Sequence, residues 1–369
     1  MRRVVLIAIL LTFLAPASAF AAHRKVPTGW LGVVADGPLT NPAFASGDEW
    51  NRLAGSGAES VRSAFYWFGV QPNGPGDADF AGTDATVLAA ASRGLSVLPV
   101  LQGTPTWAAQ TPGDPGSPPA SPATFAAYLK LLVTRYGPGG SFWAEHPELA
   151  ARPVRAWQIW NEPTIPRYWN VADWAPPYVK LLKAAHATQR HADPGAKTVL
   201  AGLPNESWEA LHRVYAAGGR HAFDVVALHP YTSKPSNVIK LVKLSRAEMR
   251  RRGDRKLPVW ITELSWPASV GKVQNGVRGF QTTDAGQESR LRRGLALLVK
   301  DRRSLRIGRV YWYTWLSQEA ATGSSFDYSG LRRIRDGQLV NAPALGAFTR
   351  EAKKLEGCAK LLGNAARCR

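Results

Sequence analysis

The stretch Trp157-Gln158-Ile159-Trp160-Asn161-Glu162-Pro163 is an apolar β-strand that ends in an amide, a carboxylate and a proline. Because proline disfavours the α-helical region for the residue before it, we expect Glu162 to stay on extended backbone at the end of the strand. A loop glutamate or a helix-capping acid is the alternative. The stretch therefore predicts a strand over 155–160 that presents a carboxylate at its C-terminal end.

A second stretch repeats this arrangement further along the chain. It reads Pro258-Val259-Trp260-Ile261-Thr262-Glu263-Leu264-Ser265-Trp266-Pro267, again an apolar strand that delivers a carboxylate. A buried carboxylate costs free energy unless it has a partner or a catalytic task. A glutamate in a salt bridge beneath a surface loop would be the alternative. Two strands of this kind suggest that Glu162 and Glu263 meet at one site.

Outward from these stretches, apolar runs alternate with amphipathic segments rich in alanine and leucine, which is typical of repeated βα units around a parallel sheet. Eight strands are expected, at 30–35, 60–66, 96–101, 155–160, 198–203, 225–229, 259–263 and 310–314. Eight helices are expected near 48–57, 83–93, 122–135, 173–192, 206–218, 235–252, 284–300 and 343–355. This pattern predicts an α/β fold, a single (β/α)8 TIM barrel.

The main competing architecture is an open, doubly wound sheet. That fold has a glycine-rich, phosphate-binding turn after its first strand. The corresponding stretch here contains no such turn: it reads Val34-Ala35-Asp36-Gly37-Pro38. Long loops after the strands, such as 105–122 with its glycines and prolines, favour the barrel, because barrel enzymes build their sites from such loops.

The N-terminus is typical of an exported protein. Arg2 and Arg3 precede an apolar run from Val4 to Leu14 and then small residues, which predicts a signal peptide over 1–22. An uncleaved anchor is the alternative, but the run is short of the roughly 20 residues that cross a bilayer. We therefore expect one domain over 23–369, secreted or associated with the cell envelope, and a monomer.

Cys358 and Cys368 are the two cysteines of the chain, and both lie near its C-terminus. In an exported protein this predicts a disulfide that closes a short tail. With no C-x-x-C, neither a redox motif nor a cysteine metal site is indicated. His186 and His191 are five residues apart on one helix, a spacing that does not place two ligands on one face. No metal is therefore expected, and no cofactor is expected either.

The formal net charge of +19 favours polyanionic partners. Outside a cell these would be anionic polysaccharides. A basic solvated surface without a specific partner is the alternative, and it is the simpler explanation of the charge. The basic residues are scattered over helical segments without a recognised nucleic-acid-binding motif, so no specific nucleic acid is expected.

Two glutamates on facing strands suit one chemistry well. Retaining hydrolysis of a glycosidic bond needs two carboxyl groups roughly 5 to 5.5 Å apart. Glu263 would be ionised and attack the anomeric carbon, while Glu162 would give a proton to the leaving oxygen. An ionised carboxylate favours protonation of a carboxyl group beside it, so proximity supports this division of roles.

The W-N-E-P motif at Trp160–Pro163 and the T-E motif at Thr262-Glu263 resemble clan A of the glycoside hydrolases, the barrel superfamily of cellulases, mannanases, xylosidases and iduronidases. The resemblance covers nearly the whole mature chain. It implies that Glu162 is the acid/base, that Glu263 is the nucleophile, and that Asn161 binds the sugar's 2-hydroxyl. A binding protein of the cell envelope that has lost catalysis is the alternative function.

The same resemblance suggests further substrate-binding residues. Arg62 would support the nucleophile, and His229 with Tyr231 would contact the nucleophile and the sugar. Trp315 would form the floor of the subsite that holds the cleaved sugar, and Trp107 is a second aromatic candidate because rings cover the C–H face of sugars. The alternatives are a surface arginine, a packed histidine and core tryptophans. The motifs leave the sugar, the linkage and endo or exo action open.

Overall fold

The computed structural model describes residues 24–41, 47–274 and 279–357. The predicted signal peptide over 1–22 lies outside the described residues, and so do Cys358 and Cys368. Export, cleavage and the disulfide therefore stay predictions. Among the described residues, no helix combines the length and the apolar composition needed to cross a membrane.

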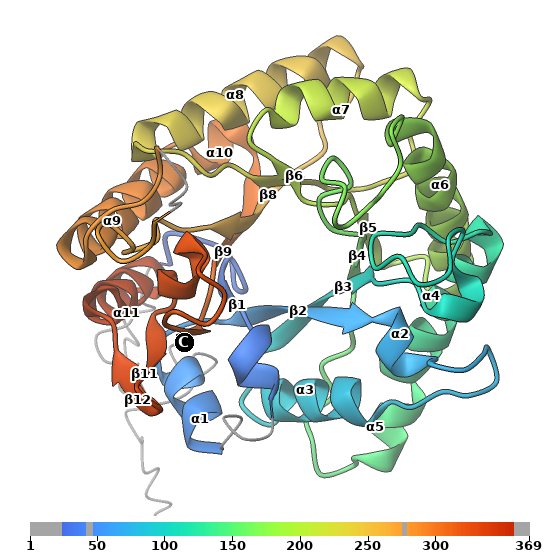
Figure 1. Cartoon of the computed structure of the whole chain (residues 1–369), viewed down its shortest axis with the longest axis horizontal. Helices are drawn as coiled ribbons and strands as arrows, with labels where there is room; N and C mark the ends of the chain where they lie inside the picture. The colour runs from blue at the N-terminus through green and yellow to red at the C-terminus, as the bar shows by residue number, and fades with distance from the viewer. Residues whose placement is uncertain (1–23, 42–46, 275–278, 358–369) are drawn as a thin grey trace, which may run out of the picture.

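The described part of the chain contains a sheet of nine parallel strands that curls into a barrel, with the helices outside (Figure 1). The order in the sheet is β5-β4-β3-β2-β1-β9-β8-β7-β6. A parallel bridge between Val199 of β5 and Val225, the residue before β7, closes the barrel. The predicted (β/α)8 barrel is confirmed. The strands are β1 (Leu31–Val34), β2 (Ser60–Tyr66), β3 (Ser96–Gln102), β4 (Ala156–Ile159), β5 (Lys197–Val199), β6 (Leu203–Pro204), β7 (Val226–His229), β8 (Val259–Leu264) and β9 (Ile307–Trp312).

One strand differs from its prediction, because the expected strand 198–203 is divided into β5 and β6. β5 pairs with β4, whereas β6 pairs with β7. Gly202 lies in the interruption, and a Cβ on it would stand 1.9 Å from the ring nitrogen Nε2 of His229. The close approach of this side chain accounts for a glycine in the middle of a strand, where glycine weakens regular pairing.

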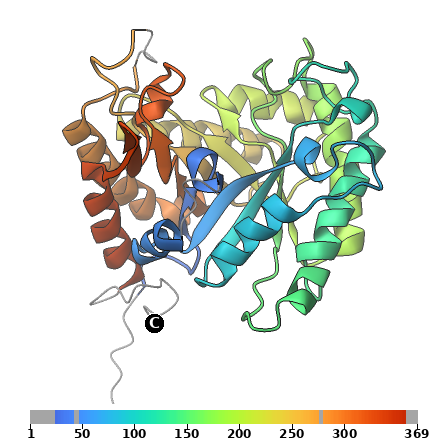
Figure 2. The same cartoon turned by 60° about the horizontal axis from the view of Figure 1, so that its bottom comes forward.

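The eight predicted helices are all present, and they surround the barrel (Figures 1 and 2). Helix α4 shows why they form: Pro122 is at its first position, and Phe125, Leu129 and Leu132 repeat on one buried face. The eight are α1 (Gly47–Gly55), α3 (Ala81–Ala91), α4 (Pro122–Tyr136), α6 (Ala175–Ala192), α7 (Ser207–Ala216), α8 (Pro235–Arg251), α9 (Asp284–Lys300) and α11 (Pro343–Glu356). The short helices α2 (Trp67–Val70), α5 (Ser141–Glu145) and α10 (Arg302–Leu305) were not predicted.

A small second sheet was also missed. It consists of β10 (Leu316–Gln318), β11 (Arg332–Arg335) and β12 (Gln338–Asn341), with β11 and β12 antiparallel. Asp336 and Gly337 connect the last two strands with φ of 48° and 75°. An Asp-Gly pair between two short strands is a strong hairpin signal that the sequence did carry.

Buried apolar side chains form two clusters on either side of the strands. The larger lies between the barrel and the helices. The smaller gathers inward-facing residues from most of the strands, as the packed interior of such a barrel requires. Its members are Val34, Leu98, Ala156, Val199, Val225, Ala227, Trp260 and Tyr311. The interior is therefore filled, and a site has to lie above it, at one end of the barrel.

Candidate active site

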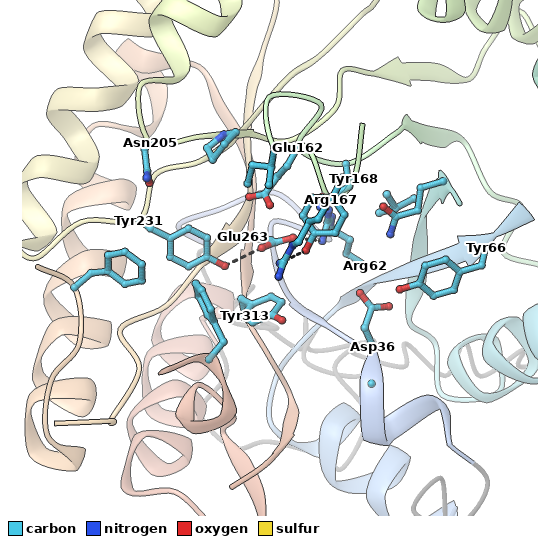
Figure 3. A pocket seen from close by; sticks show the side chains of 18 residues that line it. Asp36, Arg62, Tyr66, Glu162, Arg167, Tyr168, Asn205, Tyr231, Glu263 and Tyr313 are labelled. Atoms are coloured by element: carbon cyan, nitrogen blue, oxygen red, sulfur yellow. Dashed lines mark hydrogen bonds and ion pairs between the residues drawn. The ribbon is translucent and has the colours of Figure 1, made fainter. Parts of the chain in front are cut away.

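A cavity of about 410 Å³ opens at the C-terminal ends of the strands (Figure 3). Glu162 reaches it from just beyond β4, and Glu263 reaches it from β8. The lining residues come from strand ends and from the loops that follow them. They are Asp36, Gly37, Arg62, Tyr66, Val100, Gln102, Asn161, Glu162, Ile165, Arg167, Tyr168, Pro204, Asn205, Tyr231, Glu263, Phe280, Tyr313 and Phe326.

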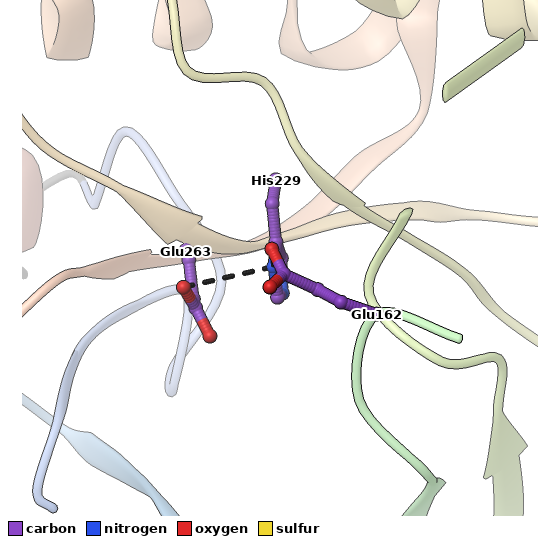
Figure 4. Close-up of side chains that lie close together, drawn as sticks. All are labelled: Glu162, His229 and Glu263. Atoms are coloured by element: carbon purple, nitrogen blue, oxygen red, sulfur yellow. Dashed lines mark hydrogen bonds and ion pairs between the residues drawn. The ribbon is translucent and has the colours of Figure 1, made fainter. Parts of the chain in front are cut away.

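The two glutamates lie close together around His229 (Figure 4). One carboxylate oxygen of each, together with one ring nitrogen of His229, lie within 4.8 Å of one another. Glu162 and Glu263 are 7% and 8% exposed, so each carboxyl group reaches the cavity but little bulk water. This spacing is close to what a retaining mechanism uses.

The backbone of Glu162 differs from our expectation of an extended residue. Its φ is 41°, and the φ of Trp160 is 71°, both in the left-handed region. The N–H of Glu162 donates to the carbonyl of Gly202, and Asn161 bridges the same residue. These pairings continue the sheet past the end of β4 and hold a conformation that costs on the order of 1 to 3 kcal/mol per residue.

Arg62 is the central cation of the site. It is 2% exposed, and its guanidinium donates to Oε1 of Glu263 at 2.8 Å and to Oδ1 of Asn161 at 2.7 Å. A third bond runs to Oε1 of Gln158 at 2.9 Å. Gln158 was not predicted, although it stands in the quoted stretch. Because the Asn161 oxygen accepts from Arg62, its amide N–H groups remain to donate to a ligand.

The nucleophile candidate is held in its ionised form by its neighbours. Burial alone raises the pKa of the Glu263 carboxyl group. The charge interactions with His229 and Arg62 act against burial, as does the Tyr231 hydroxyl, which donates to Oε2 at 2.8 Å. The net pKa of Glu263 lies below its ordinary value. Burial raises the pKa of Tyr231 well above its ordinary value, so this hydroxyl keeps its proton and can donate.

His229 bridges the two carboxyl groups. Its Nδ1 lies 2.8 Å from Oε1 of Glu162 and 3.6 Å from Oε2 of Glu263. The ring is fully buried, at the end of β7, and packs over Gly202. The structure thus brings together Glu162, Glu263, Asn161, Arg62, His229 and Tyr231, as the sequence suggested.

The two tryptophans expected to contact the sugar do not line this cavity. Trp315 is fully buried, and its indole N–H donates to Glu49 at 2.9 Å, so it cannot form the floor of a subsite. Trp107 is half-buried, and its N–H donates to the carbonyl of Gln71. Strand β9 ends at Trp312, so Trp315 lies beyond the strand on which the resemblance placed it. Tyr313 lines the cavity instead.

Several lining residues carry chemistry that was not predicted. Asp36, just beyond β1, accepts from the N–H of Ala64 at 2.6 Å, and burial raises its pKa although Arg62 acts against this. Arg167 stacks on Tyr168 with 4.5 Å between its guanidinium carbon and the ring centre. In the described part of the chain, no carboxylate forms an ion pair with Arg167. The position of Asp36 just beyond the C-terminal end of the first strand could have identified it from the sequence.

Glu162, His229 and Glu263 are also the one group of acidic and histidine side chains, within the described ranges, that is close enough to hold a metal. Arg62 already places a positive charge against Glu263 at 2.8 Å. A cation in the same place would be repelled by this guanidinium, so the donor set suits an organic substrate better than a metal.

No family model matches the chain, and no curated protein matches it either. Solved structures do resemble it. A family 39 glycoside hydrolase from Bacteroides cellulosilyticus has a TM-score of 0.64 at 19% identity, covering 89% of this chain. This chain spans 64% of the length of that enzyme. At this identity the likeness shows the fold alone, a TIM barrel like that of the Bacteroides glycoside hydrolase.

Two other structures show the same fold at different lengths. The family 39 enzyme from Xanthomonas axonopodis pv. citri has a TM-score of 0.65 at 18% identity, covering 89% of this chain and 67% of that one. The family 1 β-glucosidase from Thermotoga maritima has a TM-score of 0.63 at 11% identity, covering 90% and 99%. At these identities the likeness extends to the barrel and leaves the substrate open.

Proposed function

We propose that this chain is a retaining glycoside hydrolase, with Glu263 as nucleophile and Glu162 as acid/base. The observation that carries the proposal is the pair of carboxyl groups whose oxygens lie within 4.8 Å in one cavity, above the ends of β4 and β8. A retaining mechanism needs this short separation, whereas an inverting one leaves room for a water between carboxyl groups roughly 6.5 to 9.5 Å apart.

In the first step, an oxygen of Glu263 attacks the anomeric carbon as the bond to the leaving oxygen breaks. Glu162 donates its proton to that leaving oxygen, so the alcohol departs neutral. Arg62 and Tyr231 contact the two oxygens of Glu263 and hold the attacking group in place. The amide of Asn161, oriented by Arg62, is placed to donate to a sugar hydroxyl.

In the second step, the glycosyl ester on Glu263 is hydrolysed. Glu162, now ionised, removes a proton from water, and the resulting oxygen attacks the anomeric carbon and releases Glu263. His229 contacts Glu162 at 2.8 Å and lies between the two groups, so it keeps Glu162 in reach of both the leaving alcohol and the water.

The substrate class we propose is an oligo- or polysaccharide, with anionic polymers as candidates. Arg167 lines the cavity with a guanidinium that contacts Tyr168 but forms no ion pair with a carboxylate of the described residues, and the chain carries a net charge of +19. A sugar carboxylate or sulfate ester would be attracted to such a surface. We also propose that the protein acts as an exported monomer, which N-terminal sequencing and sedimentation of the secreted form would test.

The configuration of the first product tests the mechanism. Proton NMR of an aryl glycoside mixed with the purified chain should show, as the first sugar formed, the anomer with the same configuration as the substrate. Initial release of the opposite anomer would contradict the retaining assignment. Binding of polysaccharides without turnover of any glycoside would favour the alternative of an inactive binding barrel.

The fall of kcat/KM at acid pH should report protonation of Glu263. Because its pKa lies below 4.5, the ordinary value for a glutamate, the midpoint of the acid limb of kcat/KM should lie below pH 4.5. Arg62→Gln removes a positive charge and a hydrogen bond that favour the ionised form, so the acid limb should move to higher pH. The limb is measured on the residual activity of the variant.

Arg167→Gln is the matched control for Arg62→Gln. It removes the same charge from the same cavity, but Arg167 does not hydrogen-bond Glu263 in the described structure. The acid limb should stay at the wild-type pH in this variant. Equal shifts in both variants would mean that overall charge, and not the contact with Arg62, controls Glu263.

A further inference from the structure

Two aromatic rings are exposed beside the active-site cavity. Tyr66, the last residue of β2, is 44% exposed, and Phe68 in α2 is 50% exposed. The rings stack with centres 4.9 Å apart and planes 22° apart. Other large hydrophobic side chains that are exposed in the described ranges are aliphatic. A stacked pair left in solvent therefore stands out on this surface.

The backbone on which the pair rests is built to accommodate it. Gly103 follows β3 with φ of 79°, and its carbonyl accepts from the N–H of Phe68 at 3.0 Å. A Cβ on Gly103 would lie 2.7 Å from the ring of Phe68 and 3.1 Å from that of Tyr66. Only glycine leaves room for both rings here, so the stack has a defined position although it contributes little to the core.

Tyr66 connects the pair to the active site, whereas Phe68 lines neither cavity and adjoins them through its stack on Tyr66. Tyr66 lines the catalytic cavity from the side opposite Tyr231 (Figure 3). It also lines a second cavity of about 230 Å³, which shares Asp36 and Gly37 with the first. The hollow surface therefore continues past Tyr66. Along β2, Tyr66 lies four residues beyond Arg62, roughly 13 Å at about 3.3 Å per residue, so it is remote from the sugar that Glu263 attacks.

We propose that Tyr66 and Phe68 form a stacking platform for a sugar ring of an oligosaccharide chain, at a subsite beyond those that flank the cleaved bond. An aromatic face covers the apolar C–H face of a pyranose, and this contact does not require the sugar to be charged. This rests on the proposed function and makes it more specific. The chain binds extended saccharides, and its affinity rises when a substrate is long enough to reach the platform.

Binding to an uncleaved ligand tests the platform separately from catalysis. In a Glu162→Gln background, titration calorimetry with neutral and uronic-acid oligosaccharides, from disaccharide to hexasaccharide, should show a step in affinity at one chain length. Adding Phe68→Leu should remove that step, a loss of about tenfold. Phe68→Trp should preserve it, because the aromatic face is kept. Thermal melting checks that each variant is folded.

Leu339→Ala is the matched control. Leu339 is 37% exposed on β12, and unlike Phe68 it is not stacked on a residue that lines a cavity, so its loss should leave the step unchanged. Affinity that is independent of chain length, an unchanged step in Phe68→Leu, or no binding by any oligosaccharide would overturn the platform. Turnover of an aryl monosaccharide by the wild type tests the proposed function on its own. Chain-length-dependent binding without turnover would therefore retain the platform and remove the hydrolase.

Discussion

Glu263→Ala is expected to abolish turnover of an activated aryl glycoside, with kcat lowered on the order of 10⁴- to 10⁶-fold, as for loss of other covalent nucleophiles. Without the carboxylate, no glycosyl-enzyme ester can form. Azide is small enough to enter the vacated space and attack the anomeric carbon from the same side. Adding azide should therefore restore turnover and give a glycosyl azide whose configuration is opposite to that of the substrate, which NMR identifies.

Glu288→Ala is the control for this loss. Glu288 lies on the outer helix α9, where it pairs with Arg350 at the surface, so its removal should leave turnover unchanged. Surface pairs of this kind contribute little to stability. Normal turnover in Glu263→Ala, or rescue by azide with retained configuration, would refute the assignment of Glu263 as nucleophile.

Glu162→Ala should give a loss that depends on the leaving group. A poor leaving group needs protonation by Glu162, and its cleavage should slow by about 10² to 10⁴-fold. A dinitrophenolate leaves without a proton, so its release should remain fast while hydrolysis of the glycosyl ester becomes limiting. A burst of dinitrophenol followed by slow turnover, measured by stopped-flow absorbance, is the expected result.

Azide distinguishes the two glutamates. In Glu162→Ala, azide needs no general base to attack the ester on Glu263, so it should speed turnover and give a glycosyl azide with the configuration of the substrate. Equal losses for good and poor leaving groups would contradict the acid/base role. An azide product of inverted configuration would mean that the roles of Glu162 and Glu263 are exchanged.

Most of the fold could be predicted because the relevant signals are local. Apolar runs that end at Glu162 and Glu263, and amphipathic repeats such as 122–135, define strands and helices through side-chain spacing alone. The division of the fifth strand at Gly202 could not be predicted in the same way. It depends on the ring of His229, which approaches Gly202 only after the barrel has closed.

The site was predicted less evenly, again for a physical reason. Glu162, Asn161 and Glu263 end apolar strands, so their place at the barrel's end followed from the chain. The burial of Trp315 against Glu49 did not, because it depends on where β9 ends and on a partner from a distant helix. Gln158 was missed because it gains its role from its bond with Arg62, which is distant in the chain. Asp36 was missed although its place just beyond β1 carried a signal.

By itself the sequence determined the alternation of strands and helices and the positions of the two glutamates at strand ends. Both features follow from the spacing of apolar residues and prolines along the chain. Only the tertiary structure decided that their oxygens lie within 4.8 Å, with His229 between them and Arg62 beside Glu263. Distances between strands depend on register and closure of the barrel, which arise from packing across the whole chain.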